Sequence, residues 1–423
     1  MAARGFRRRI SDSSTARAGL CFVALVVVAE VAVLLLAPGE EGIPPDEVVA
    51  SELFNADALD RASDFRGGQR LLLVGGLAAQ AIAVGALAVG RPRFARDFLG
   101  RLSSRHVLGA AAAGVVIVVV AEVVAFPTTL AAHERSVDVG LSTQSLGPWL
   151  VDQMKGLGIG AVVAGAGAAA LSGLIRRYPR RWWVPGTAVV IGYGAAMSLL
   201  APVLIAPRFN DFEELEGGSQ LRASVVDLGE RAGVDVGEVY RVDASRRSTV
   251  LNAYVAGIGL TKRVVLYDTL IDGTSEPELE SVVAHELAHV AHSDIPRGIL
   301  FAAIVTPLGL LLVRELNGTL ARRAGAEPGS PAAVPALFLA IAIVSFAVNV
   351  PANQLSRQVE ASADAFALRI TDDPKGLEDL QVRLAERNLS DVEPPGWATA
   401  LFGTHPTTLE RVGSARAWGR GSR

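Results

Sequence analysis

Two histidines and a glutamate in the stretch 278–294 have the types and spacing of a zinc site. The stretch contains His285-Glu286-x-x-His289. On an α-helix, residues i and i+4 lie on one face about one turn apart, so both imidazoles can bind one metal ion. The glutamate between them then stands beside a water that the metal activates. The chemistry indicated is hydrolysis of a peptide bond by that water.

The motif requires a helix, and the flanking residues predict one. Ser275, followed three residues later by Glu278, forms a capping box. Apolar residues follow, and Asp294-Ile-Pro296 is expected to end the helix. The same motif also occurs by chance, so histidines that bind no metal are the alternative. A third protein ligand is needed, because catalytic zinc sites use three and leave the fourth position to water or substrate.

Two carboxylates after the last apolar segment are candidates to complete the site. Residues 357–368 are predicted to form a helix, in which Glu360 and Asp364 lie one turn apart among alanines. Glu360 could bind the metal while Asp364 accepts the N–H of a ligand histidine and fixes its tautomer. Two carboxylates on a solvated helix face are the alternative. The alanines favour close packing, because a solvated face usually carries lysine or arginine partners.

The composition predicts that these residues belong to an integral membrane protein. Half of the 423 residues are hydrophobic, and the mean hydropathy is +0.36. Such a chain is too apolar for an ordinary soluble enzyme. The net charge of −3 and the lack of a strong basic stripe argue against nucleic acid as a partner. The single cysteine, Cys21, rules out an intrachain disulfide and a cysteine-based zinc site.

Seven apolar segments are long enough, or nearly so, to cross a bilayer, which requires about 20 residues per helix. They lie near residues 19–37, 70–90, 107–126, 156–174, 184–206, 298–314 and 332–350. The predicted fold class is mainly α, a polytopic membrane protein with about seven transmembrane helices and a small α+β zinc-protease domain. The expected divisions are helices one to five, a protease insertion, helices six and seven, and the C-terminal part of the protease domain, at 1–206, 207–297, 298–350 and 351–423.

Two features of the predicted spans leave alternatives open. The first span follows Arg7-Arg8-Arg9 and also suits a cleaved signal peptide, although the lack of a clear cleavage site favours a retained helix. Glu30 and Glu122 fall inside spans, where a charged group is costly and tends to face a polar interior. A water-filled chamber is one interpretation. The other is a neutral or hydrogen-bonded Glu30 and a Glu122 near a helix end.

Loop charges predict the orientation in the membrane. Arginines gather in the N-terminal segment and in the second, fourth and sixth loops. The positive-inside rule places all four in the cytoplasm. The loops 39–66 and 207–297 are mainly acidic, so the motif helix is expected on the extracytoplasmic side. The excess of arginine over lysine, with abundant alanine and glycine, suggests a bacterial chain and therefore the bacterial plasma membrane.

The 207–297 insertion is predicted to contain a small sheet beside the motif helix. Residues 220–232 form an amphipathic helix, which Gly233 ends. Short β-rich runs follow at 238–242, 250–255 and 264–267. A strand just before a zinc helix can bind an extended substrate as an added strand. A sheet that only covers the helix is the alternative, because periodicity does not distinguish the two.

The motifs, in this order and spacing, resemble the CAAX prenyl protease type 1 family, integral-membrane zinc metallopeptidases of the gluzincin kind. The resemblance covers most of the chain. The motifs that carry it are Pro207-Arg-Phe-Asn210, Ser245-Arg-Arg-Ser248, Asn252-Ala-Tyr254, Arg263-Val-Val-Leu-Tyr-Asp268, His285 to His289, Glu360-x-x-x-Asp364 and His405-Pro-x-x-x-Glu-Arg411.

The resemblance implies roles for the candidate site residues. One zinc ion per chain would be bound by His285, His289 and Glu360. Glu286 would be the general base, which takes a proton from water and returns it to the leaving amine. His405 and Arg411 would also line the active site. Either of them would stabilise the oxyanion. His292 shares the motif face, but the ligand set is already complete, so a helix-end role is favoured.

The resemblance says less about the substrate. The substrate-binding edge strand would include Asn252, Ala253 and Tyr254. The expected partners are the lipid bilayer and a membrane-associated peptide or protein substrate. Val250 stands where family members commonly have a histidine, which weakens any transfer of specificity for prenylated substrates. The loop charges also conflict with the resemblance, because the eukaryotic enzymes work toward the cytosol.

Three other functions remain open. A heat-shock-type membrane quality-control protease would use the same chemistry, usually with fewer spans. A site-2-type intramembrane protease is disfavoured, because the residues that flank the motif are too polar for a lipid-buried helix. A non-enzymatic membrane receptor or scaffold would bind no zinc.

Overall fold

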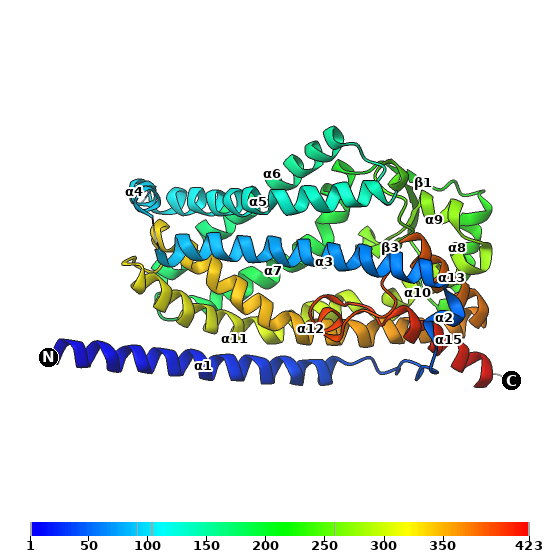
Figure 1. The fold of residues 1–423 in the computed structure, drawn as a ribbon. Coiled ribbons are helices and arrows are strands. Elements are labelled where there is room, and N and C mark those ends of the chain that lie inside the picture. Colours follow the sequence, from blue (N-terminus) through cyan, green and yellow to red (C-terminus); the bar gives the residue numbers. More distant parts are fainter. Residues whose placement is uncertain (1, 91, 103–104, 258, 422–423) are drawn as a thin grey trace.

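The computed structural model describes residues 2–90, 92–102, 105–257 and 259–421, which form a bundle of long helices with one small sheet at its end (Figure 1). Within these ranges, seven helices are long and apolar enough to cross a membrane. They are Ala16–Leu36, Ala56–Gly90, His106–Asp138, Leu146–Arg177, Trp183–Arg208, Asp294–Arg323 and Pro331–Thr371. Each contains or overlaps one predicted span, so the predicted fold class is confirmed.

The bundle consists of long helices that continue beyond the apolar segments. They are α1 (Ala2–Leu36), α3 (Ala56–Gly85), α5 (His106–Asp138), α6 (Leu146–Arg177), α7 (Trp183–Leu204), α11 (Asp294–Arg323) and α12 (Val334–Thr371). Four of them contain an internal proline and continue past it. Such prolines are tolerated in membrane helices, because neighbouring groups satisfy the freed carbonyls. Two short helices, α2 (Ala50–Leu53) and α4 (Arg93–Leu102), lie in connecting segments.

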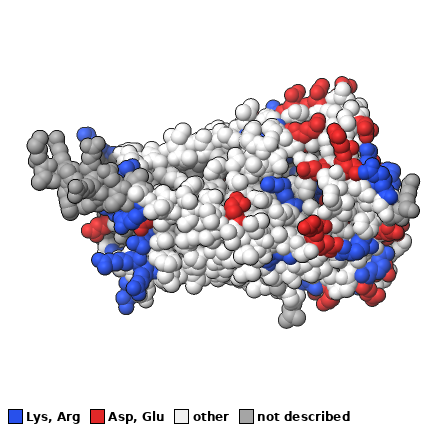
Figure 2. Space-filling model, turned by 90° about the horizontal axis from the view of Figure 1, so that it is seen from below, with Lys and Arg blue, Asp and Glu red and all other residues white. Residues whose placement is uncertain are grey.

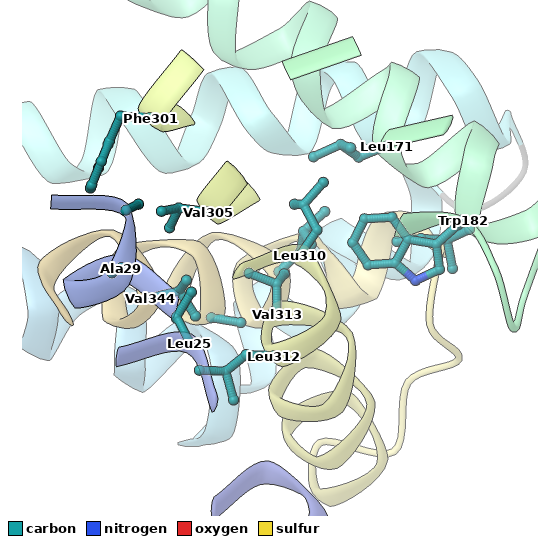
Figure 3. Close-up of a cluster of buried hydrophobic side chains, with 14 of the residues drawn as sticks. Leu25, Ala29, Leu171, Trp182, Phe301, Val305, Leu310, Leu312, Val313 and Val344 are labelled. Atoms are coloured by element: carbon teal, nitrogen blue, oxygen red, sulfur yellow. The ribbon is translucent and has the colours of Figure 1, made fainter. Parts of the chain in front are cut away.

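Buried apolar side chains join the bundle on one side. The largest cluster combines residues of α1, α11 and α12 with Leu171 of α6 and Trp182 at the start of α7 (Figure 3). On the other side, α5 and α6 pack through small residues. A Cβ on Gly114 of α5 would lie 2.7 Å from the carbonyl oxygen of Ala164 in α6. A Cβ on Gly165 of α6 would in turn lie 3.1 Å from Val115 of α5, so these two glycines allow close helix packing. Most other glycines of α6 meet nothing within 4 Å.

The protease end contains a four-stranded sheet with the order β1-β2-β4-β3. Its strands are β1 (Phe212–Glu214), β2 (Glu238–Val242), β3 (Ala253–Ala256) and β4 (Arg263–Tyr267). Strand β4 pairs parallel with β2 and antiparallel with β3. Strand β3 therefore lies at an edge of the sheet, while β1 at the other edge was not predicted.

The start of β3 differs from the prediction of a strand over 250–255. The backbone N–H and C=O of Leu251 bind the side chain of Asn388, at 2.9 and 3.2 Å. The carbonyl oxygen of Val250 accepts from Thr269 Oγ1 at 2.7 Å. These side chains take the backbone groups that a strand would use, so the strand begins at Ala253 and Asn252 precedes it.

Helix α10 (Glu276–Ala291) carries the motif and has the predicted capping box. The prediction that 294–296 ends this helix was wrong. The chain turns at Ser293, which has a left-handed φ of 56°, and Asp294 opens α11 with Pro296 in its first turn. A proline fits there because the first N–H groups of a helix have no partner within the helix. The residues that resemble a helix stop are therefore the start of the next helix.

Helix α12 connects the membrane bundle to the protease end. The predicted helix 357–368 is its last part, and no break occurs at the expected division at 351. The remaining helices pack around this end. They are α8 (Gln220–Ala232), α9 (Asp268–Gly273), α13 (Pro374–Arg387), α14 (Gly396–Phe402) and α15 (Thr408–Gly421). Any side chain near the end of α12 is thus fixed by a helix that also belongs to the bundle.

Charged side chains gather at the two ends of the molecule, with a largely uncharged belt between them (Figure 2). The charged side chains at one end are mostly basic, whereas the other end carries most of the acidic ones together with further basic ones. Helix α4 lies at one end of the bundle, and α10 and the sheet lie at the other (Figure 1). The bundle therefore separates the arginine-rich α4 segment from the motif helix.

Candidate metal centre

Three side chains converge between α10 and α12. His285, His289 and Glu360 each offer a ligand atom, and these atoms lie within 4.8 Å of one another. Nε2 of His285 is 3.1 Å from Glu360 Oε2, and Nε2 of His289 is 3.8 Å from Oε1. Two imidazole nitrogens and a carboxylate oxygen form a three-residue donor set that suits catalytic zinc. The structure thus brings the predicted ligands together.

The other ring nitrogen of each histidine meets a carboxylate. Nδ1 of His285 lies 2.9 Å from Asp364 Oδ1, and Nδ1 of His289 lies 2.9 Å from Asp294 Oδ2. A carboxylate in this position accepts the Nδ1 proton and leaves Nε2 free to bind a metal. Sequence reasoning found Asp364 but missed Asp294, which it assigned to a helix end. The available signal was a carboxylate five residues after the second histidine.

Arg411 of α15 binds both carboxylate oxygens of Asp364. Its Nε donates to Asp364 Oδ2 at 2.7 Å, and its Nη2 donates to Oδ1 at 2.6 Å. Paired hydrogen bonds of this kind fix a carboxylate in both position and orientation. Burial lowers the pKa of Arg411, but the neighbouring Asp364 outweighs this effect and the pKa is raised. The guanidinium therefore stays charged and engaged with Asp364.

The surroundings of His285 favour a positive charge. Burial lowers the pKa of its imidazole, but the carboxylates of Asp364 and Glu360 outweigh burial and raise the pKa to about 10. The same carboxylates would stabilise a divalent cation, which would take the place of that proton. The donor set and its electrostatics therefore both fit a zinc ion.

Glu286 lies between the ligand histidines and the edge strand. Its Oε2 accepts the backbone N–H of Val255 in β3 at 3.2 Å. Burial raises the pKa of its carboxyl, and the two histidines offset part of this effect. A carboxyl whose pKa is moved toward neutrality can both accept and return a proton. The structure thus places a carboxyl suited to proton transfer beside the edge strand β3.

His405 approaches Glu360 from the segment before α15. Its Nε2 lies 3.2 Å from Glu360 Oε2, and 53% of its side chain is exposed. It can therefore reach a molecule in the adjoining cavity. His292, in contrast, caps the end of α10. Its Nε2 lies 3.6 Å from Glu40 Oε2, and its Nδ1 lies 3.5 Å from Ser362 Oγ. It is not part of the ligand cluster.

Two cavities adjoin the metal centre, one near the start of β3 and one near its end. One of about 570 Å³ is lined by Asn252, Ala253, Glu286 and His405, among others. Another of about 450 Å³ is lined by residues that include Val255, His289 and Glu360. An extended chain that pairs with the edge of β3 would pass the ligand residues between these cavities.

Tyr254 does not share this position. Side chains alternate along a strand, and the ring of Tyr254 packs edge-on against Tyr267 with centroids 6.3 Å apart. Burial raises the pKa of its hydroxyl to about 12. Its side chain lines neither of the two cavities beside the ligands. The expectation that Tyr254 binds substrate thus has no support from its side-chain contacts.

Comparisons with known proteins identify the class of enzyme. The model described as "Peptidase family M48" matches residues 218–419, and that described as "CAAX prenyl protease N-terminal, five membrane helices" matches residues 44–211. Together the two matches cover most of the chain, from the segment after α1 to the last helix of the protease end. These matches confirm the predicted class of enzyme, a membrane metallopeptidase. The M48 match includes the three candidate ligands and the carboxylates paired with the two histidines.

Several named proteins are similar to this chain. The uncharacterized metalloprotease YhfN of Bacillus subtilis is 28% identical over 70% of this chain and 71% of its own length. The probable CAAX prenyl protease 1 of Schizosaccharomyces pombe is 29% identical over 64% of this chain and 58% of its own length. A Protease HtpX homolog of Acidiphilium cryptum is 29% identical over 64% of this chain and 90% of that protein. Matches of this extent leave the substrate open.

A solved structure has the same fold. The crystal structure of S. mikatae Ste24p has a TM-score of 0.70 to this chain, with 20% sequence identity. The similarity covers 95% of this chain and 97% of that one. At this identity the comparison shows the shared fold of membrane helices and protease end.

Proposed function

We propose that this protein is a membrane zinc metalloendopeptidase that hydrolyses peptide bonds in membrane-associated proteins or peptides, with one zinc ion per chain. The observation that supports the proposal most directly is the convergence of His285, His289 and Glu360, with a carboxylate behind each histidine. A zinc ion held there would polarise the scissile carbonyl and acidify a water molecule.

The protein's own side chains would move the proton and stabilise the developing charge. Glu286 would accept a proton from the attacking water and deliver it to the leaving amine. His405 would donate a hydrogen bond to the oxyanion, a role worth about 3 kcal/mol for one good donor. Arg411 already directs Nε and Nη2 at Asp364. We therefore assign it to holding Asp364 and leave the oxyanion to His405.

The substrate would lie along β3 as an added strand. Its backbone would meet the free edge of the strand near Ala253, and its side chains would enter the two adjoining cavities. Asn252 lies at the start of this edge and is exposed. The contact between Glu286 and Val255 would then bring the proton carrier close to the scissile bond.

The catalytic end would face the extracytoplasmic side of a bacterial plasma membrane. The support is the grouping of basic side chains at the end away from the motif helix (Figure 2). The only natural cysteine is Cys21 in α1, so Cys21→Ser provides a background for labelling. A cysteine at exposed Glu213 should react with a membrane-impermeant reagent in intact cells. Reaction only after lysis would reverse this orientation.

The test of the mechanism is Glu286→Gln, which removes the proton carrier but keeps its size. We expect an unchanged zinc content and a turnover lower by about 100- to 10,000-fold, the range for general acid–base catalysis. Turnover is measured by cleavage of a fluorogenic peptide with the protein in liposomes. Zinc content is measured by metal analysis of the same sample. The matched control is Glu276→Gln on the exposed start of α10. Substantial residual proteolysis would remove Glu286 from the mechanism.

A second function, membrane quality control, is favoured by the match over 90% of the Protease HtpX homolog. Cross-linking of Glu286→Gln in native membranes distinguishes quality control from the processing of specific substrates. Capture of a few proteins through one defined segment supports processing of specific substrates. Capture of many misfolded membrane proteins supports quality control, and capture no greater than for the wild type favours a receptor or scaffold.

A further inference from the structure

A segment without helix or strand, residues 37–49, crosses behind the metal centre; we call it the strap. It connects α1 to α2 and passes the ends of α12 and α15 (Figure 1). These two helices supply the residues on one side of the metal centre, Glu360 and Asp364 from α12 and Arg411 from α15. The proposed catalytic chemistry gives the strap no role.

The strap contacts α12 immediately beside the proposed ligand. A Cβ on Gly42 would lie only 2.6 Å from the Cβ of Ala361, the residue after Glu360. Side chains do not approach so closely, so only glycine allows the strap to lie here. Gly42 has no left-handed φ, so the requirement is one of space rather than of backbone conformation. Further along α12, Arg369 Nη2 donates to Glu40 Oε2 at 2.8 Å.

The strap is also bound to α15 just after Arg411. Ser414 Oγ donates to the carbonyl oxygen of Ile43 at 2.8 Å. The backbone N–H of Asp46 donates to the carbonyl oxygen of Gly413 at 3.1 Å. A Cβ on Gly413 would lie 2.3 Å from the carbonyl oxygen of Asp46, so the two backbones are in close contact. The strap is therefore attached to both helices.

A cavity lies between the strap and the carboxylate of Asp364. Its volume is about 570 Å³, and it is lined by strap residues together with Ala361, Asp364 and Arg411. Side-chain packing therefore does not fill this face of α12 and α15. The strap bridges the two helices across the cavity.

We propose that the strap is a positioning element of the metal centre. It clamps α12 to α15 on the face away from the ligand histidines and so keeps Asp364 on Arg411 and Glu360 directed at the metal. The inference rests on the proposed zinc site. The strap acts through these residues and does not itself touch the metal or the substrate.

The test is Gly42→Ala in the full-length protein in liposomes. The added methyl group should push the strap from α12 and weaken zinc binding about tenfold, the lower end for residues that support metal ligands. Competition with a chelator measures the zinc affinity, and the visible spectrum of the Co²⁺-substituted protein reports the ligand geometry. Gly39→Ala is the matched control, because a Cβ there meets nothing within 4 Å.

The double variant Gly42→Ala with Ala361→Gly separates positioning from general damage. It removes the contact at 2.6 Å and leaves the next at 3.2 Å, so zinc affinity and the cobalt spectrum should largely recover. Ala361→Gly alone corrects for the effect of a glycine in the helix. A wild-type zinc affinity in Gly42→Ala, whatever its melting temperature, would overturn the inference.

A third variant keeps the test decisive if Gly42→Ala does not fold. Ser414→Ala removes only the hydrogen bond to Ile43. A lower zinc affinity would support the clamp, and a wild-type affinity would overturn it. If the wild-type protein itself bound no zinc, the proposed function would fail before any strap variant was measured. The two failures are therefore distinguishable.

Discussion

The two histidines proposed as zinc ligands lie in similar surroundings that are assembled in different ways. His285 directs Nδ1 at Asp364, which Arg411 holds with two hydrogen bonds. These residues come from α10, α12 and α15, which are far apart in the sequence. The His285 side of the centre therefore exists only when the whole protease end has folded.

The His289 side is built locally. Its Nδ1 meets Asp294, and Arg297 pairs with that carboxylate one turn further along α11. Only the turn at Ser293 separates the two helices. The side chain of His289 is 22% exposed, against 7% for His285. A histidine that meets a carboxylate, which is itself paired with an arginine, thus occurs twice. On the His285 side the three residues are buried and come from distant parts of the chain. On the His289 side they are close in sequence and more accessible.

Glu360 is shared by both sides, so its loss should have the largest effect. It lies 3.1 Å from His285 and 3.8 Å from His289. Glu360→Ala should lose nearly all bound zinc, because two histidines alone make an incomplete catalytic set. Metal analysis after dialysis measures this loss. Glu327→Ala, at an exposed position between α11 and α12, is the control, and an unchanged zinc content in Glu360→Ala would exclude Glu360 as a ligand.

Asp364→Ala tests the buried side. We expect zinc affinity to fall about 10- to 100-fold, because His285 loses the group that fixes its tautomer. Stability should fall by about 3–5 kcal/mol, because the buried guanidinium of Arg411 keeps its charge without a partner. Chelator competition and the melting temperature measure the two effects. In Asp364→Ala with Arg411→Met, stability should return while zinc affinity stays low; joint recovery would show that Asp364 acts only through stability.

Local signals in the sequence were sufficient for most of the fold. Hydropathy and length located the seven spans, and short runs rich in β-forming residues located β2 and β4 to within one residue. The start of β3 was not accessible in this way. Leu251 gives its backbone groups to Asn388, which lies in a distant part of the chain and only meets it after folding.

The candidate site shows the same division between local spacing and tertiary contact. The spacing of the motif suggested His285, Glu286 and His289 without knowledge of the fold. Asp294 was missed because an aspartate before a proline fits the end of one helix and the start of another equally well. The position of Arg411 was predicted, but whether it faces an oxyanion or Asp364 depends on how α15 packs against α12.

Asp294→Ala tests the accessible side and should have the smallest effect of the three. We expect zinc affinity to fall about tenfold, at the lower end for such carboxylates. Water can reach the more exposed His289 and accept its Nδ1 proton in place of Asp294. Asp294→Asn should lose less, because it keeps an oxygen acceptor at the same place, and Asp272→Ala, at an exposed carboxylate, is the control. Chelator competition under the conditions used for Asp364→Ala gives the ratio of the two losses. A loss in Asp294→Ala equal to that in Asp364→Ala would mean that exposure does not distinguish the two sides, and that the turn at Ser293 holds its histidine as firmly as the long-range contacts hold theirs.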